Sequence, residues 1–443
     1  MKSSKTRIPT WYEKMYYYCY SENETCSITF TFEMDEAVDP TALRKSLSLA
    51  LRRYPCFRVT PLLDDKDNVI LVDNDRDPVV LNLSIRNWKS SSIGSDESNG
   101  YLFRTAYDGK KITVSCFHGI GDGRGCLSFC RTVLYYYLTL LGHTIDSKGM
   151  VLTHETPVDA TEMEDPMELY ADPAPDPGPQ IAPYTAYQLP GDRFPLDTPM
   201  HTRRFLFSVD AGSLMDETHD GFSTPFSLLS SIIAESIQRN YDIGGKTISV
   251  NGAVDMRPYF NNNALSNMAN IFDIPFTDSF FKVNTEKRAR LIRQVMNRTL
   301  TRRHFAAAMF NGLNIFRNMM SGPVTDETVL QNSRKALYDL RNAVGSFMIT
   351  NIGRTDMPAD MSRHILSCEL TIPATVYYPV FSVVTHRNRM SVTLVTRTDS
   401  DEFAKLFLSS MHRYGIPTEF MEDSYYENDR LSPRDLGRLL FSN

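Results

Sequence analysis

A long proline-rich stretch divides this chain into two parts, and both parts alternate strand and helix patterns. Nine prolines lie between residues 153 and 198, where few apolar residues recur at any regular period. Proline fixes φ and lacks an N–H, so it interrupts helices and central strands. Long irregular segments of this kind join domains or shape a binding site. The sequence therefore predicts an N-terminal unit over residues 1–155, a crossover over 156–200 and a C-terminal unit over 201–443.

The first unit carries clear periodic patterns. Apolar and polar residues alternate over residues 27–34, which predicts a half-buried strand. Asp39 and Pro40 are a start signal for a helix that ends before Pro55. The remaining patterns predict strands over 69–72, 79–85 and 111–117, then a glycine-rich turn, then a buried helix over 126–141.

The second unit repeats the mixture without any short solenoid repeat. Its sequence pattern predicts strands over 203–209, 247–254 and 345–351, and a hairpin over 376–385 and 389–396. It predicts helices over 225–241, 286–320, 326–343, 400–414 and 433–441. The whole chain is thus expected to be α/β, with mixed sheets.

Charge and hydropathy exclude several classes of protein. The 443 residues are enough for a sizeable core without disulfide or metal staples. Lys and Arg number 47 against 53 Asp and Glu, a mildly acidic balance that does not fit a dedicated nucleic-acid binder. The start has no signal-peptide pattern, and no apolar run approaches the ~18 residues of a membrane span. We therefore expect a cytoplasmic protein with no nucleic-acid partner and no membrane span.

The cysteines do not indicate a metal or a disulfide framework. Their number is odd and no Cys-x-x-Cys pair occurs, so reduced, buried thiols are expected. A zinc site would need more Cys and His at ligand spacing, and no metal is predicted. The seven are Cys19, Cys26, Cys56, Cys116, Cys126, Cys130 and Cys368.

His118 is the strongest candidate for chemistry. It follows the strand of 111–117 and begins the run His-Gly-Ile-Gly-Asp-Gly. The glycines leave room around the imidazole, and an exposed imidazole there could act as a general base near neutral pH. Asp122, four residues on, could hydrogen-bond back into the turn or form an ion pair that fixes it. From these residues alone, a loop histidine with a helix-capping aspartate remains an open alternative.

The run 118–123 matches His-x-x-x-Asp-Gly, and the chain resembles the chloramphenicol-acetyltransferase-like superfamily of acyltransferases. The resemblance spans nearly the whole chain and is closest to the bacterial alcohol acetyltransferase-like and condensation-domain-like group. Three further segments carry it: 43–58 with its Tyr-Pro-x-Phe-Arg ending, 254–258 (Val-Asp-Met-Arg-Pro) with Asn267 and Asn270 after it, and 346–354 with Asn351-Ile352-Gly353.

The resemblance implies two similar lobes that meet at a central tunnel. His118 would be the general base, and Asp122 would be structural and pair with an arginine, best matched by Arg257. Gly123 would keep the turn tight. An acyl group would move from a thioester, acetyl-CoA or another acyl-CoA, to an alcohol or amine through a tetrahedral oxyanion. The acyl-CoA would be a substrate, with no permanently bound cofactor and no metal, and the chain would be a monomer.

The donor for that oxyanion is the least defined part of the expected site. Ser346, Thr350 and Asn351 are the candidates in the late strand. Such a donor matters, since removing one typically costs about 100- to 1,000-fold in rate.

The chain also departs from the family's pattern. Phe117 stands where many members have a first histidine, which argues against a peptide-synthetase condensation domain. The plant-type Asp-Phe-Gly-Trp-Gly motif is absent, and residues 351–354 occupy its region. Two alternatives therefore stay open: a non-catalytic two-lobed binding protein of the same fold, and a condensation enzyme whose donor sits on an acyl carrier protein.

Other segments allow competing interpretations. Cys116 and Cys126 flank the motif as possible nucleophiles, although burial in the core explains them better. The glycine-rich run lacks the Gly-Lys-Ser/Thr of a phosphate loop. The basic residues between 287 and 304 suit a solvated face, or a contact for the phosphates of coenzyme A or of a carrier-protein arm. The aromatic residues of 11–20 suit the core or the lining of an acceptor site.

Overall fold

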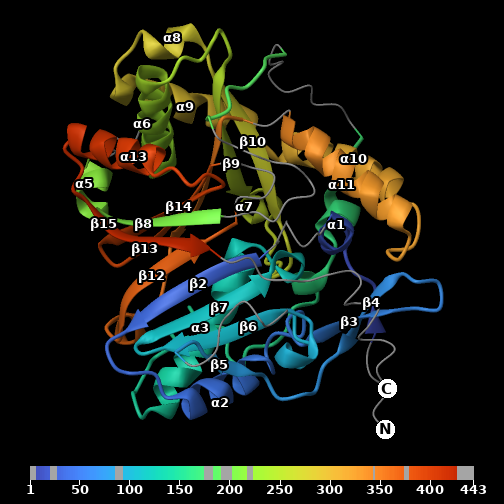
Figure 1. The fold of residues 1–443 in the computed structure, drawn as a ribbon. Helices are drawn as coiled ribbons and strands as arrows, with labels where there is room; N and C mark the ends of the chain where they lie inside the picture. The colour runs from blue at the N-terminus through green and yellow to red at the C-terminus, as the bar shows by residue number, and fades with distance from the viewer. Residues whose placement is uncertain are drawn as a thin grey trace.

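The protein consists of two lobes, each built on a mixed β-sheet with helices packed against it. A computed structural model describes residues 6–19, 27–84, 93–173, 183–190, 202–216, 223–342, 345–373 and 379–426. Figure 1 shows the lobes one above the other. The expected fold class, α/β with mixed sheets in two lobes, is confirmed.

The first lobe contains a five-stranded sheet whose core face is covered by two long helices. Alternation along the second strand buries Ile28, Phe30 and Phe32 completely. Helix α2 (Pro40–Ala50) begins at Asp39, whose side chain caps it, and helix α3 is Gly123–Leu140. The strands in spatial order are β12 (Ile365–Thr371), β2 (Ser27–Met34), β7 (Lys111–Phe117), β6 (Phe103–Asp108) and β5 (Val80–Asn82). A smaller antiparallel sheet lies beside it: β1 (Thr6–Arg7), β4 (Val69–Asp73) and β3 (Val59–Leu63).

The second lobe contains a seven-stranded sheet with its own hydrophobic core. Its strands in spatial order are β10 (Ala269–Phe276), β9 (Ile248–Asp255), β11 (Phe347–Arg354), β13 (Val380–His386), β14 (Arg389–Thr396), β8 (Thr202–Asp210) and β15 (Thr418–Tyr426). Its helices are α5 (Ala211–Asp216), α6 (Pro225–Asn240), α7 (Arg257–Phe260), α8 (Asp278–Phe281), α9 (Thr285–Thr299) and α13 (Glu402–Arg413).

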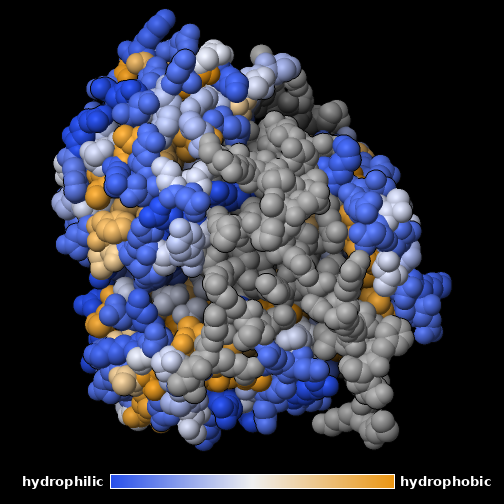
Figure 2. All heavy atoms as spheres, viewed as in Figure 1, coloured by the Kyte–Doolittle hydropathy of each residue, from blue (hydrophilic) through white to orange (hydrophobic). Residues whose placement is uncertain are grey.

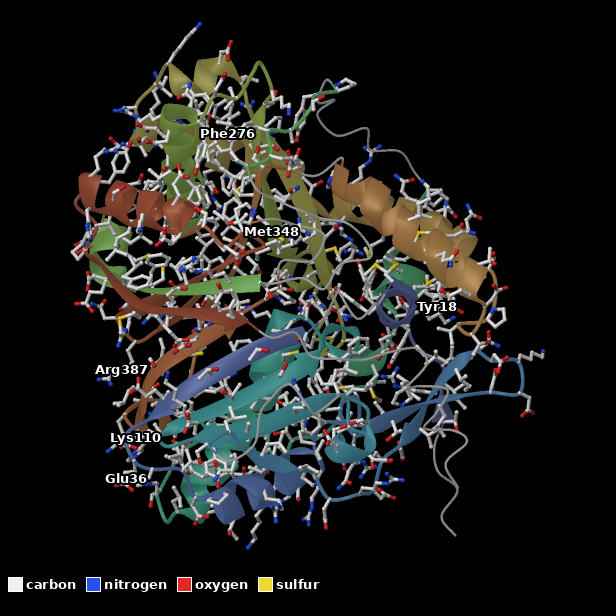
Figure 3. The ribbon with its side chains drawn as sticks, viewed as in Figure 1. Tyr18, Glu36, Lys110, Phe276, Met348 and Arg387 are labelled. Atoms are coloured by element: carbon white, nitrogen blue, oxygen red, sulfur yellow. The ribbon has the colours of Figure 1, made fainter. Side chains whose placement is uncertain are left out.

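The N-terminal helix α1 (Trp11–Cys19) lies beside the helices α10 (Arg302–Met319) and α11 (Glu327–Asn342), as Figure 1 shows. The Tyr18 hydroxyl donates to the Gly322 carbonyl at 2.7 Å, between these two helices (Figure 3). The Trp11 N–H donates at 2.7 Å to Asp165, in the crossover. Five short helices complete the described part of the chain: 3₁₀ turns at Asp96–Ser98, His118–Ile120 and Ala160–Met163, and the helices α4 (Pro166–Tyr170) and α12 (Ala359–Ser362).

The two lobes do not divide at one point in the sequence. Strand β12 comes from the second half of the chain but pairs antiparallel with β2 of the first lobe. On β8, Arg204 forms a buried ion pair with Glu369 of β12, which ties the lobes together. The expected units 1–155 and 201–443 do not account for this exchange, because a sheet is completed by strand pairing rather than by chain order.

The structure corrects one predicted helix and adds strands that the sequence did not suggest. The helix expected over 286–320 is two helices, because the chain breaks at Leu300 and the Thr301 side chain caps α10. Six strands were not predicted: β1, β3, β6, β10, β12 and β15. Five of them lie at sheet edges, and β6 lies inside the five-stranded sheet, between β7 and β5. Edge strands tolerate proline and charge, as at Pro61 in β3 and Pro275 in β10. The helix expected over 433–441 lies outside the described residues.

Within the described part of the chain, no helix is long and apolar enough to cross a membrane. Figure 2 shows a mainly hydrophilic described surface on this face, with hydrophobic side chains scattered over it. Six of the cysteines are buried thiols, as expected, and Cys26 lies outside the described residues.

Candidate active site

The site is built where β7 ends and α3 begins. His118 opens a single 3₁₀ turn, His118–Ile120, directly after β7. Asp122 then caps α3, and its Oδ1 accepts hydrogen bonds from the N–H groups of Arg124 at 3.1 Å and Gly125 at 3.0 Å. The cap and the strand end therefore fix both sides of the turn that presents the imidazole.

Arg257, at the start of α7, joins this turn to the second lobe. Its guanidinium binds both carboxylate oxygens of Asp122, at 3.0 and 2.9 Å. The same guanidinium binds Asp255 at 2.9 Å and donates to the carbonyls of Ala264 at 2.6 Å and Ser266 at 2.8 Å. Planar two-point pairing of this kind gives geometric specificity as well as energy. The ion pair expected between Asp122 and Arg257 is thus present, across 135 residues of chain.

Asp122 is 3% exposed, and its charge is well compensated. Its Oδ2 also accepts from the Met268 N–H at 2.9 Å. Burial alone would raise the pKa of Asp122, but the Arg257 guanidinium and the backbone N–H donors outweigh it, so the pKa lies below its ordinary value of 3.8. The carboxylate is therefore ionised at neutral pH and acts as a fixed anchor for the turn.

Asn267 determines which nitrogen of His118 carries the proton. The Asn267 amide NH₂ donates to the backbone carbonyls of His118 at 2.7 Å and Gly119 at 3.1 Å. Its Oδ1 must therefore face the ring, and it lies 2.9 Å from His118 Nδ1. An amide oxygen only accepts hydrogen bonds, so Nδ1 is the protonated nitrogen of the neutral ring. The lone pair of the ring is then on Nε2.

The surroundings of His118 favour this neutral form. Burial lowers the pKa of His118 below its ordinary value of 6.5. A hydrogen bond to its own backbone, the Asp122 carboxylate and the Asn267 amide oppose this effect without reversing it. The residue is half-buried rather than exposed as the sequence suggested. An imidazole that is neutral at pH 7 with Nε2 unprotonated has the state that a general base requires.

Aromatic rings pack around the histidine. Tyr16 of α1 stacks on the His118 ring, with centroids 4.5 Å apart and an interplanar angle of 18°. Phe117, which precedes His118, is 2% exposed and packs its ring against Tyr17, with centroids 5.1 Å apart. A Cβ on Gly119 would lie 2.4 Å from the Phe117 ring, so this position needs glycine.

Two glycines at the start of α3 let residues from the second half of the chain pack closely against this helix. A Cβ at Gly123 would lie 2.8 Å from the Ile352 side chain of β11. A Cβ at Gly125 would lie 2.1 Å from the Leu265 carbonyl oxygen, in the loop that also carries Asn267. The backbone of that loop therefore lies directly against the helix, which places Asn267 beside His118.

We predict that Gly125→Ala destabilises the fold by about 3 kcal/mol or more, because the obstacle is backbone rather than a flexible side chain. Gly312→Ala in α10 is the matched control, since its Cβ would meet only the Met167 Cε, at 3.4 Å. That helix substitution should be neutral or stabilising by up to about 1 kcal/mol. Urea unfolding of both variants measures the difference, and equal stabilities would contradict the prediction.

The oxyanion candidates lie along the start and end of β11. Ser346 is fully buried, and its Oγ accepts from the Ser249 N–H at 3.1 Å, toward β9. Thr350 is buried on β11 beside Ser382 of β13. The Asn351 Oδ1 accepts from the Gly353 N–H at 2.8 Å, at the end of β11 that contacts Gly123. Among the described contacts, no hydrogen bond joins these three side chains to His118. Their role stays a prediction, as does the central tunnel.

The structure also bears on the other interpretations of the sequence: a cysteine nucleophile, a basic contact surface and a metal site. Burial raises the pKa of the Cys116 and Cys126 thiols, which disfavours the thiolate that a nucleophile requires. Arg288 of the basic segment is buried and pairs with Glu235 at 2.9 Å, so it belongs to the core. Among the described residues, no three His, Cys, Asp or Glu side chains gather as a metal site would require.

The contacts of Asn267 and Tyr16 with His118 are not predicted from the sequence. Asn267 belongs to a segment that carries the family resemblance, but its spacing from Arg257 does not indicate that it reaches His118. Tyr16 lies in the aromatic start, where helical spacing from Tyr12 was the only available signal.

Comparison with known proteins supports the fold. The sequence matches no protein-family model and no curated protein. TRI101 of F. graminearum, solved with coenzyme A and T-2 mycotoxin, is 11% identical with a TM-score of 0.59, over 94% of this chain and 99% of that one. The condensation domain of the monacolin K polyketide synthase MokA is 14% identical with a TM-score of 0.57, over 92% and 96%. The epimerization domain of tyrocidine synthetase B is 10% identical with a TM-score of 0.57, over 93% and 95%. The chain therefore has the two-lobed fold of these proteins, the chloramphenicol-acetyltransferase-like fold that its motif led us to expect.

Proposed function

We propose that this protein is an acyltransferase that moves an acyl group from a thioester to an alcohol or amine, with His118 as general base. The observation that carries the proposal is the state of His118: a neutral imidazole whose Nδ1 proton is held by Asn267, which leaves Nε2 to accept a proton. The motif that holds it, Asp122 with Arg257, joins residues of both halves of the chain.

In the proposed reaction, Nε2 of His118 removes a proton from the acceptor hydroxyl or amine. The acceptor oxygen or nitrogen then attacks the thioester carbonyl and forms a tetrahedral oxyanion. When this intermediate collapses, the carbon–sulfur bond breaks, and the leaving thiolate takes the proton from the His118 imidazolium. Asp122 and Arg257 take no part in proton transfer; they hold the turn in place. Among the oxyanion candidates, Asn351 is the first to test, because it lies next to Ile352, which contacts Gly123.

For the donor, we propose acetyl-CoA or another acyl-CoA. A structural neighbour was solved with coenzyme A, which supports this choice. A second candidate is a condensation enzyme with a donor on an acyl carrier protein, which the likeness to a condensation domain favours. Both donors present the same pantetheine thioester, so the chemistry at His118 is common to them.

The proposal is tested by thiol release from a series of acyl-CoAs, with a mixed panel of alcohols and amines as acceptors. Release that needs both donor and acceptor is the expected result. Acetyl-pantetheine, offered at the same concentration, separates the two donors, because a carrier-dependent enzyme would use it as well as acetyl-CoA. If no thiol is released above the background without enzyme, the non-catalytic binding protein is the better account.

Asn267→Ala should lower kcat/KM by about ten- to a hundred-fold, because one hydrogen bond to the ring and two to the turn are lost. Asn270→Ala is the matched control, since its Oδ1 accepts only from the neighbouring Ile271 N–H in the described contacts. Steady-state kinetics of both variants are the measurement. Equal losses in both would show that Asn267 has no special role.

A further inference from the structure

The proposed reaction does not use Tyr16, although this is the aromatic side chain that stacks on His118. The two rings lie 4.5 Å apart and almost parallel, in the range of a favourable stacked pair. Tyr16 also meets Phe117 edge-on, with centroids 6.2 Å apart. One face of the imidazole is therefore covered by a phenol ring, and the Nδ1 edge is held by Asn267.

The position of Tyr16 is set by anchors at both ends of α1. At the start, the Trp11 indole N–H donates to Glu168 at 2.7 Å, and Glu13, only 1% exposed, binds Arg7 at 2.6 Å. At the end, the Tyr18 hydroxyl is bound to Gly322. These contacts reach the crossover and the α10–α11 connection. The helix is thus fixed independently of the histidine, and the stack is imposed on the imidazole by the fold.

We propose that Tyr16 is a positioning residue for His118, whose stacked ring holds the plane of the imidazole and stabilises the imidazolium cation that forms during proton transfer. An aromatic face carries negative charge density and attracts a cation more than a neutral ring. The stack therefore favours the protonated form, which is the form nearer the transition state. This consequence for catalysis rests on the proposed function, whereas the effect on titration of the histidine does not.

Other groups also face His118, and the test must leave them in place. Asp122 on α3 favours the imidazolium, and its charge is paired with Arg257 of α7. From α1, the Tyr12 phenol interacts with Asp122 and the Tyr17 ring packs on Phe117. Burial raises the pKa of both hydroxyls, so both are neutral near pH 7. Asn267 adds a hydrogen bond but no charge. A substitution confined to Tyr16 changes none of these groups.

The experiment compares Tyr16→Phe with Tyr16→Leu by an NMR titration of His118 in the full-length protein. The His118→Asn variant identifies the signal among nine histidines. Phenylalanine keeps the aromatic face, whereas leucine supplies a smaller apolar cover without it. Water admitted beside the smaller side chain would raise the pKa of His118, so a lower pKa in the Leu variant reports the lost aromatic face. We expect His118 in the Phe variant to have the same pKa as in the wild type. In the Leu variant, we expect the pKa of His118 to be lower by about half a pH unit to one unit. Acyl-transfer kinetics should show the same displacement in the acidic limb of the pH profile.

Two results would overturn this inference: a Leu variant that titrates with the wild type, or a Phe variant that shifts as far as Leu. If Tyr16→Leu fails to fold, judged by its thermal melting, Tyr16→Met supplies an unbranched apolar cover for the same comparison. The titration shift without any thiol release would support the stack while removing the proposed function. Thiol release with no change in the pKa of His118 in the Leu variant would support the proposed function and remove the role of the stack.

Discussion

Replacing His118 by alanine is expected to reduce thiol release from acyl-CoA by about 100- to 10,000-fold, the usual contribution of a general base. The loss should fall mainly on kcat, because the imidazole acts on the acceptor proton rather than on binding. The thiol assay of the wild type and the variant, at saturating donor and acceptor, measures it. The fold should survive, since His118 is half-buried and makes one side-chain hydrogen bond to another residue, Asn267, among the described contacts.

The control is His143→Ala, because His143 lies in the loop after α3 and stacks on His364, away from the motif. This variant should retain wild-type activity. The pH profile adds a second check. Burial holds the pKa of His118 below 6.5, so activity should be complete at neutral pH and should fall only as the pH drops through that lower value. Equal rates for wild type and His118→Ala would remove His118 as the base.

Local sequence rules predict where Asp122 and Arg257 each lie, but they do not predict the ion pair between them. Asp122 stands between a strand and a helix, where a carboxylate caps the helix. Arg257 follows a strand and precedes Pro258, which starts a helix. Neither rule brings the two together. That step came from resemblance to a family, and the structure supplies the bond distances.

The remaining contacts could not be predicted because they depend on how the lobes pack. Asn267 reaches His118 only because Gly125 lets the Leu265 backbone lie against α3. Strand β12 pairs with β2, and six of its seven residues are buried, although apolar and polar residues do not alternate regularly along it. The break at Leu300 depends on the Thr301 cap, a signal that a continuous amphipathic pattern conceals.

Removing the carboxylate of Asp122 should destabilise the fold strongly. Asp122→Ala leaves the Arg257 charge buried with Asp255 as its remaining carboxylate, and it takes an acceptor from the Met268 N–H and from the start of α3. Breaking a buried ion pair in this way typically costs about 3–5 kcal/mol. Arg257→Met should cost less, because Asp122 keeps three backbone N–H donors.

The control is Asp39→Ala, which removes a helix cap without removing an ion pair. Asp39 caps α2 through the N–H groups of Thr41 at 2.8 Å and Ala42 at 3.2 Å, so its loss should cost about 1 kcal/mol. Urea unfolding measures the free energy of unfolding of Asp122→Ala and of Asp39→Ala. The difference between the two losses is the contribution of the ion pair with Arg257.

The contribution of Asp122 to stability depends on pH with a definite sign. Because folding lowers the pKa of Asp122 from 3.8, its stabilisation is complete above that value and is lost as the pH falls through the lower folded-state pKa. The gap between wild type and Asp122→Ala should therefore be constant near neutral pH and close only in acid; a gap no larger than that of Asp39→Ala would mean that the ion pair contributes nothing to stability.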